Sequence, residues 1–113
     1  MNKKLDVSFL LRNTKETDIN GQASICDLFS LGCYLLVTAG ENSIKRIAGR
    51  KMCRTALFSL KNLSNSKLIR IMKKVDMLGK NKKMDCKILP ELLQGVPHCE
   101  INNLFEKEGI KIK

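Results

Sequence analysis

At 113 residues and 12.8 kDa, the chain has room for one ordinary domain. Hydrophobic residues make up 43% of it, which excludes wholesale disorder, while aromatic residues are only 4%, so the core must be aliphatic. The chain carries 21 Lys and Arg against 11 Asp and Glu, a formal net charge of +10. A charge this large favours polyanions, either nucleic acid or an anionic membrane surface, over acidic metabolites as partners.

The sequence lacks the patterns of a membrane or secreted protein. Its longest apolar run, from Leu28 to Val37, covers about ten residues, whereas a transmembrane helix needs roughly 20. The amino-terminal lysines are followed by Asp6 and Arg12 instead of an uninterrupted apolar stretch with a cleavage site. The five cysteines are odd in number and show no C-x-x-C spacing, which favours reduced thiols. We therefore expect a cytoplasmic protein that does not enter a membrane.

The amino-terminal part of the chain is predicted to be β structure. Apolar residues alternate with polar ones over 5–11, and the dipeptide Asn20-Gly21 is typical of a turn. Two further short apolar runs, over 23–31 and 33–38, stop at glycines. Residues 1–45 are therefore expected to form a three-stranded antiparallel sheet.

The following segment, residues 46–96, is predicted to be helical. Apolar residues recur at helical spacing over 50–63 and 67–78, with an interruption at Ser64-Asn65-Ser66, where Ser64 or Asn65 can cap the second helix. Gly79 is expected to end that helix. A short helix capped by Asp85 and extending through Leu93 follows, although Pro90 fits poorly inside it.

The predicted fold class is therefore α+β, a small three-stranded antiparallel sheet followed by two to three α-helices. The expected divisions are a sheet domain over 1–45, a basic helical region over 46–96, and a segment over 97–113 that is either the start of a further domain or a disordered tail.

Positive charge is concentrated in the middle of the chain. Residues 42–83 contain thirteen Lys and Arg but one acidic residue, Asp76. Solubility alone favours mixed signs, so this imbalance predicts polyanion binding. A helix start surrounded by cations can contact phosphates through side chains and free backbone N–H groups. The candidate contacts at the junction between sheet and helix are Lys45, Arg46, Arg50, Lys51 and Arg54.

Catalysis has little support in the sequence. The single histidine, His98, is adjacent to Cys99, and neighbouring loop residues seldom supply the geometry of a nucleophile and its base. A metal site from Cys86, His98 and Cys99 would have no recognised ligand spacing. Glycine-rich phosphate-binding motifs are missing. We therefore expect no enzyme activity, no cofactor, no metal and no small-molecule substrate.

One stretch resembles a known family. The string Val7-Ser8-Phe9-Leu10-Leu11-Arg12, a lysine, a polar link ending in Gly21, and then Gln22-Ala23-Ser24-Ile25 is similar to the amino-terminal arm-type DNA-binding domain of tyrosine recombinases, phage integrases carried by mobile elements of Bacteroides-type bacteria. The likeness continues through Gly32 and Thr38-Ala39-Gly40, and by order and spacing into the helices. The sequence departs from the family pattern at Ser24, where proline is usual, and at Asp27, which stands in the strand expected to face DNA.

The resemblance implies a function in DNA integration and recombination. The sheet would bind double-stranded DNA at arm sites, with Lys4, Arg12 and Lys15 as its phosphate contacts. Catalytic residues in such recombinases lie far downstream, so a chain truncated here would bind DNA without cutting it. A full-length recombinase is then a further expected partner.

Two alternatives remain open from the sequence. Residues 50–78 fit a helix-turn-helix regulator that uses no sheet. In the other alternative, the chain is a non-functional recombinase remnant or a protein-interaction piece with no nucleic-acid specificity. Ile101, Leu104 and Phe105 would then be exposed because their partner helices are missing.

Overall fold

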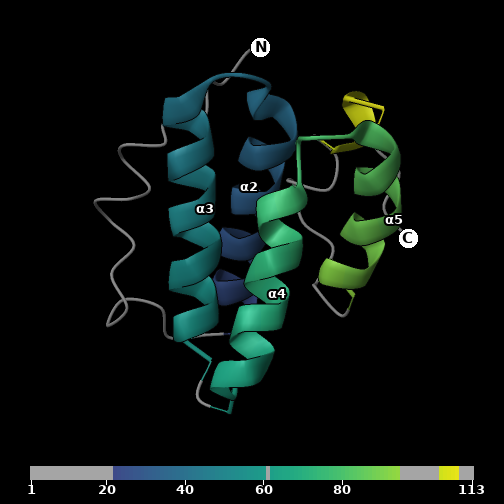
Figure 1. The fold of residues 1–113 in the computed structure, drawn as a ribbon. Coiled ribbons are helices and arrows are strands. Elements are labelled where there is room, and N and C mark those ends of the chain that lie inside the picture. The colour runs from purple at the N-terminus through teal and green to yellow at the C-terminus, as the bar shows by residue number, and fades with distance from the viewer. Residues whose placement is uncertain (1–21, 61, 95–104, 110–113) are drawn as a thin grey trace.

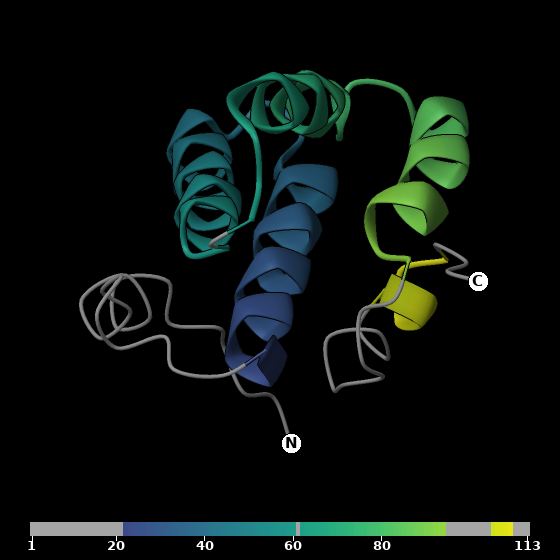
Figure 2. The same ribbon diagram turned by 90° about the horizontal axis from the view of Figure 1, so that it is seen from below.

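The computed structural model describes residues 22–60, 62–94 and 105–109, with side chains from residue 25 onward. Four helices follow one another in these ranges: α2 (Gln22–Ala39), α3 (Ser43–Phe58), α4 (Asn65–Met77) and α5 (Lys82–Leu92). They form a bundle in which α2 lies in the middle, with α3, α4 and α5 around it (Figures 1 and 2). None of the helices in these ranges has the length and apolar character needed to cross a membrane.

The predicted sheet is contradicted, because the described part of the chain contains helices and no strand. The two runs expected as strands over 23–31 and 33–38 are consecutive parts of the single helix α2. The first predicted strand, over 5–11, lies outside the described residues. The physical reason is that α2 is apolar on nearly every side and buried along its length. A short apolar run of this kind does not distinguish a buried helix from a buried strand.

Gly32, which was expected to end a strand, instead marks the contact between α2 and α3. A Cβ atom at Gly32 would lie 2.8 Å from the carbonyl oxygen of Gly49 and 2.7 Å from the Sγ of Cys53. A Cβ atom at Gly49 would in turn lie 2.8 Å from the carbonyl oxygen of Gly32. The two backbones can therefore approach this closely only because both positions lack a side chain.

Helix α3 begins earlier than predicted. Asn42 caps it, its side chain accepting a hydrogen bond from the backbone N–H of Lys45 at 3.0 Å. The expected division between residues 45 and 46 therefore falls inside this helix. Ala48, Met52 and Ala56 of α3 share one core with the residues of α2, so the segments on both sides of that division pack together.

Helices α4 and α5 follow the predicted order closely. Ser64 is confirmed as the cap of α4, accepting from the backbone N–H of Lys67 at 3.3 Å. Gly79 has a φ of 83°, a left-handed conformation that ends the helix region as expected. Helix α5 is capped by Asn81 and not by Asp85, which lies inside its first turns, and Pro90 is accommodated near its end.

Phe105 belongs to the core, which corrects the expectation that it is exposed. Its side chain is fully buried, and its ring packs edge-on against Tyr34 with 5.5 Å between the ring centroids. The carboxy-terminal residues 105–109 thus cover part of α2. Ile101 and Leu104 lie outside the described residues.

Candidate functional site

The predicted cluster of cations at the start of α3 divides into residues that hold the fold and residues that face solvent. Arg46 belongs to the first group. Its Nη1 donates to the carbonyl oxygen of Leu78 at 3.0 Å and its Nη2 to that of Asp76 at 3.3 Å. These carbonyls have no partners within the end of α4, and a cation is favoured at this end of a helix. Arg46 therefore caps α4 from α3.

Arg50 and Lys45 are also engaged within the protein. The Nε of Arg50 lies 2.7 Å from a carboxylate oxygen of Asp76, so the single acidic residue of the basic region neutralises it. Lys45 is half-buried, with its Nζ 3.5 Å from the carbonyl oxygen of Thr38. Both cations are thus less available to a polyanion than their positions in the sequence suggest.

Lys51 and Arg54 face solvent on the outer side of α3. They share that side with Ile44, Ile47 and Phe58, all at intervals of three or four residues. The guanidinium carbon of Arg54 lies 5.4 Å from the centroid of the Phe58 ring, a cation–π arrangement. The exposed face of α3 therefore combines positive charge with apolar side chains.

Most of the remaining predicted residues belong to parts of the chain that the structure does not describe. Lys4, Arg12 and Lys15 lie outside the described residues, as do His98 and Cys99. Cys86 is exposed on α5. Within the described ranges, no group of three or more His, Cys, Asp or Glu side chains is arranged to hold a metal ion.

Sequence reasoning omitted the cations of α4 from the site. This helix separates two hollows in the surface. The first, here called the furrow, lies between α3 and α4, has a volume of about 300 Å³ and is lined by Arg54, Phe58, Ile69 and Lys73 among others. The sequence does contain a signal for this side of α4, because residues 69, 73 and 76 are spaced at intervals of three and four and so fall on one side of a helix.

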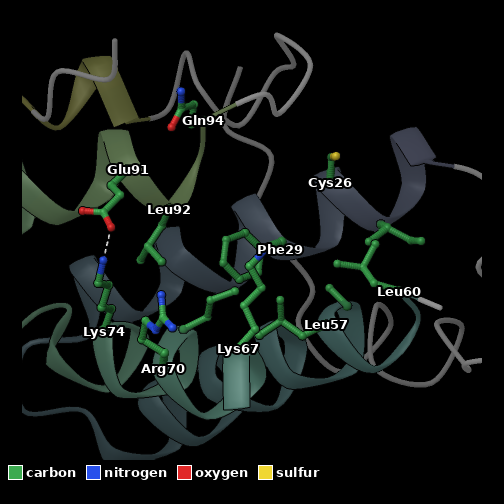
Figure 3. A pocket seen from close by; sticks show the side chains of 13 residues that line it. Cys26, Phe29, Leu57, Leu60, Lys67, Arg70, Lys74, Glu91, Leu92 and Gln94 are labelled. Carbon is green, nitrogen blue, oxygen red and sulfur yellow. Dashed lines mark hydrogen bonds and ion pairs between the residues drawn. The ribbon is translucent and has the colours of Figure 1, made fainter. Parts of the chain in front are cut away.

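The second hollow, here called the groove, lies on the opposite side of α4 and has a volume of about 360 Å³. Its lining is mostly apolar and comes from all four helices. Lys67, Arg70 and Lys74 of α4 line it, and Lys74 forms an ion pair with Glu91 of α5 (Figure 3). The furrow and the groove have no lining residue in common.

A polar junction joins α3, the end of α4 and α5. It consists of Arg46, Gly79 and Asp85. Asp85 is 1% exposed, and its carboxylate accepts the backbone N–H of Gly79. Burial raises the pKa of Asp85, although the hydrogen bond from Gly79 and the positive charge of Arg46 act in the opposite direction. The junction is a structural element and lies apart from both hollows.

Two buried thiols meet between α2 and α3. The Sγ atoms of Cys33 and Cys53 are 3.8 Å apart, and both residues are fully buried. Burial raises the pKa of Cys53 well above its ordinary value, and the neighbouring Cys33 adds to this shift. A thiol held in the neutral form is a poor nucleophile and a poor metal ligand. This pair therefore belongs to the core.

Comparison with protein families, with curated protein sequences and with solved structures gives no match for this chain.

Proposed function

We propose that the protein binds double-stranded DNA without catalysis, through the outer face of α3 and α4. The observation that carries this proposal is the charge of the two helices, which together contain nine Lys and Arg and one acidic residue. Phosphate contacts supply most of the affinity of sequence-independent DNA binding. The resemblance to recombinase arm domains implied a sheet that the described residues do not contain, so it is not the basis of this proposal.

The proposed phosphate contacts are Lys51, on the outer side of α3, together with Arg54 and Lys73, which line the furrow. All three are exposed, and within the described residues none of them forms an ion pair. Arg54 and Lys73 line the furrow from the two neighbouring helices α3 and α4 (Figure 1). Arg46 and Arg50 are left out of the set because their guanidinium groups already serve the fold.

The test is the salt dependence of binding to a labelled duplex, followed by fluorescence anisotropy. A triple variant, Lys51→Glu with Arg54→Glu and Lys73→Glu, should bind more weakly and lose about 3 from the slope of log K against log salt concentration. The matched control is Lys80→Glu with Lys83→Glu and Lys87→Glu. It makes the same change of net charge at exposed positions that line neither hollow.

Equal losses in the two triple variants would contradict the proposal, because net charge would then account for the binding without a specific face. The same titration with single-stranded DNA of equal length shows whether the spacing of a duplex matters. Tighter binding of the single strand would assign the exposed ring of Phe58 a stacking role instead.

An anionic membrane surface is a second candidate, favoured by one observation. The large apolar residues exposed in the described part of the chain all lie on the same two basic helices: Ile44, Ile47, Phe58, Ile69 and Met77. Such a mixture is typical of helices that lie at a membrane surface. Sedimentation with vesicles containing phosphatidylserine, compared with neutral vesicles, tests it. Replacing Ile47 and Phe58 by serine should abolish vesicle binding but leave the salt slope for duplex DNA unchanged.

A further inference from the structure

The groove combines an apolar floor with a row of cations along one edge. Phe29, Leu57, Ile71 and Leu92 contribute to the floor, and each comes from a different helix. Figure 3 shows these elements around one hollow, with Phe29 near its middle. Its volume of about 360 Å³ lies within the range of ligand sites, which is about 300 to 1,000 Å³. A ligand for this hollow must bury apolar surface.

The cation row consists of Lys67, Arg70 and Lys74, which repeat at intervals of three and four residues along α4. The row extends over two helical turns, about 10 Å. Lys74 is already paired with the carboxylate of Glu91 across the groove. Lys67 and Arg70 are exposed, and neither forms an ion pair with a described residue. The pairing with Glu91 thus shows that carboxylates complement the cation row, and Lys67 and Arg70 remain to pair with further carboxylates.

The charge of the chain argues against a second copy, or the chain's own amino-terminal residues, as the occupant of the groove. A second copy would carry a net charge of +10 toward a basic edge. The amino-terminal residues 1–21 contain four Lys and Arg against three Asp and Glu, so they supply no excess of acid either. A small amphiphile with one anionic head would use one cation of a row that extends over two turns. An acidic helix presents several carboxylates at the same spacing, and its apolar side chains can fill the floor.

We propose that the groove binds an acidic amphipathic helix of a partner protein. The apolar side chains of that helix would pack against Phe29 and Ile71, and its carboxylates would pair with Lys67 and Arg70. The groove lies on the side of α4 opposite the furrow, so this interaction does not depend on the proposed DNA binding. Rim charges of this kind fix the orientation of the partner and speed its association.

The experiment uses the full chain and a labelled helical peptide of about five turns. The peptide carries leucine at intervals of three and four residues, with glutamate at flanking positions. Binding is measured by anisotropy near physiological salt. Lys67→Glu with Arg70→Glu should weaken binding about tenfold or more. The control, Lys83→Glu with Lys87→Glu, makes the same change of net charge on α5 outside the groove and should bind nearly as well as the unmodified chain.

Four results would overturn the proposal. The first is equal binding of a scrambled peptide of the same composition, which would reduce the interaction to net charge. The second is an equal loss in both double variants. The third is an absence of methyl NMR shifts at Ile71 and Leu92 in the complex, which would place the peptide elsewhere. The fourth is displacement of the peptide by dodecanoate at a concentration below that of the peptide, which would identify the ligand of the groove as a single-headed amphiphile. The DNA titration tests substitutions at Lys51, Arg54 and Lys73, whereas the peptide titration tests Lys67 and Arg70. Failure of one proposal therefore leaves the other intact.

Discussion

Both carboxylate oxygens of Asp85 accept the backbone N–H of Gly79, at 3.0 Å and 3.2 Å. The bond joins the beginning of α5 to the chain just beyond α4. Arg46, from α3, caps the carbonyls of the same turn. Residues from three helices therefore meet at a position with no free space for another side chain.

Asp85→Asn should make stability less dependent on pH. Burial raises the pKa of Asp85, so the folded state holds this proton more tightly than the unfolded state does. The ionised side chain therefore costs stability above the raised pKa, and the cost disappears as pH falls to the ordinary carboxyl range. An asparagine oxygen can still accept the N–H of Gly79. We expect the variant to be at least as stable as the unmodified chain at pH 7. The difference between their free energies of unfolding should shrink toward acidic pH.

Urea unfolding between pH 7 and the acidic range checks the prediction for Asp85. A variant that is clearly less stable at pH 7 would contradict it, because the attraction between the carboxylate and Arg46 would then outweigh the cost of burial.

Gly79→Ala should destabilise the protein far more than Gly40→Ala. Both glycines have positive φ values, 83° and 58°, which cost an alanine roughly 1 to 2 kcal/mol. A Cβ atom at Gly40 would meet nothing within 4 Å, whereas one at Gly79 would lie 2.1 Å from the carbonyl oxygen of Leu36. The overlap at Gly79 forces the backbone to move. We expect about 1 kcal/mol for Gly40→Ala and more than about 3 kcal/mol for Gly79→Ala, measured by thermal or urea unfolding. Equal losses would show that α2 does not approach this turn closely.

Arg46→Ala should lower stability by about 2 kcal/mol, since hydrogen bonds from a charged donor contribute about 1.5 to 3 kcal/mol. The carbonyl oxygens of Asp76 and Leu78 would lose this donor. The matched control on the same helix is Lys51→Ala, an exposed position that should change stability by less than about 0.5 kcal/mol. The two variants also separate fold from function, because Lys51 is proposed to contact phosphate and Arg46 is not. If both variants unfold at the same urea concentration, Arg46 is not a structural cap.

Local signals in the sequence predicted the ends of α4 well. Ser64 has the side chain that an N-cap requires, and Gly79 has the freedom that a left-handed turn requires, so each position carries its own physical reason. The helix expected over 67–78 therefore has nearly the observed boundaries, whereas the one expected over 50–63 begins and ends later than α3 does. The expected cap at Asp85 was wrong because an acidic side chain inside a first turn can serve a different backbone N–H, here that of Gly79.

Features that depend on distant contacts could not be predicted in this way. Helix α2 is surrounded by other elements, so its sequence lacks the polar face that would have shown a helical period. Gly32 was read as a strand end because its partner, Gly49, is separated from it in sequence. Arg46 and Lys51 look alike in the sequence, and only the position of the α4 carboxyl end distinguishes a capping residue from a free cation.

The cysteines should divide by reactivity according to their burial. Cys86 is exposed, whereas Cys33 and Cys53 are fully buried in contact with each other. The raised pKa of Cys53 also keeps its thiol protonated at neutral pH, which removes the nucleophilic form. In the folded protein we expect iodoacetamide to label Cys86 within minutes, and Cys33 and Cys53 only at the rate of unfolding. Peptide mass spectrometry after timed quenching measures each site separately, and a sample in urea gives the reference rate. Rapid labelling of Cys53 without denaturant would show that α2 and α3 separate readily, which the close contact of Gly32 with Gly49 argues against.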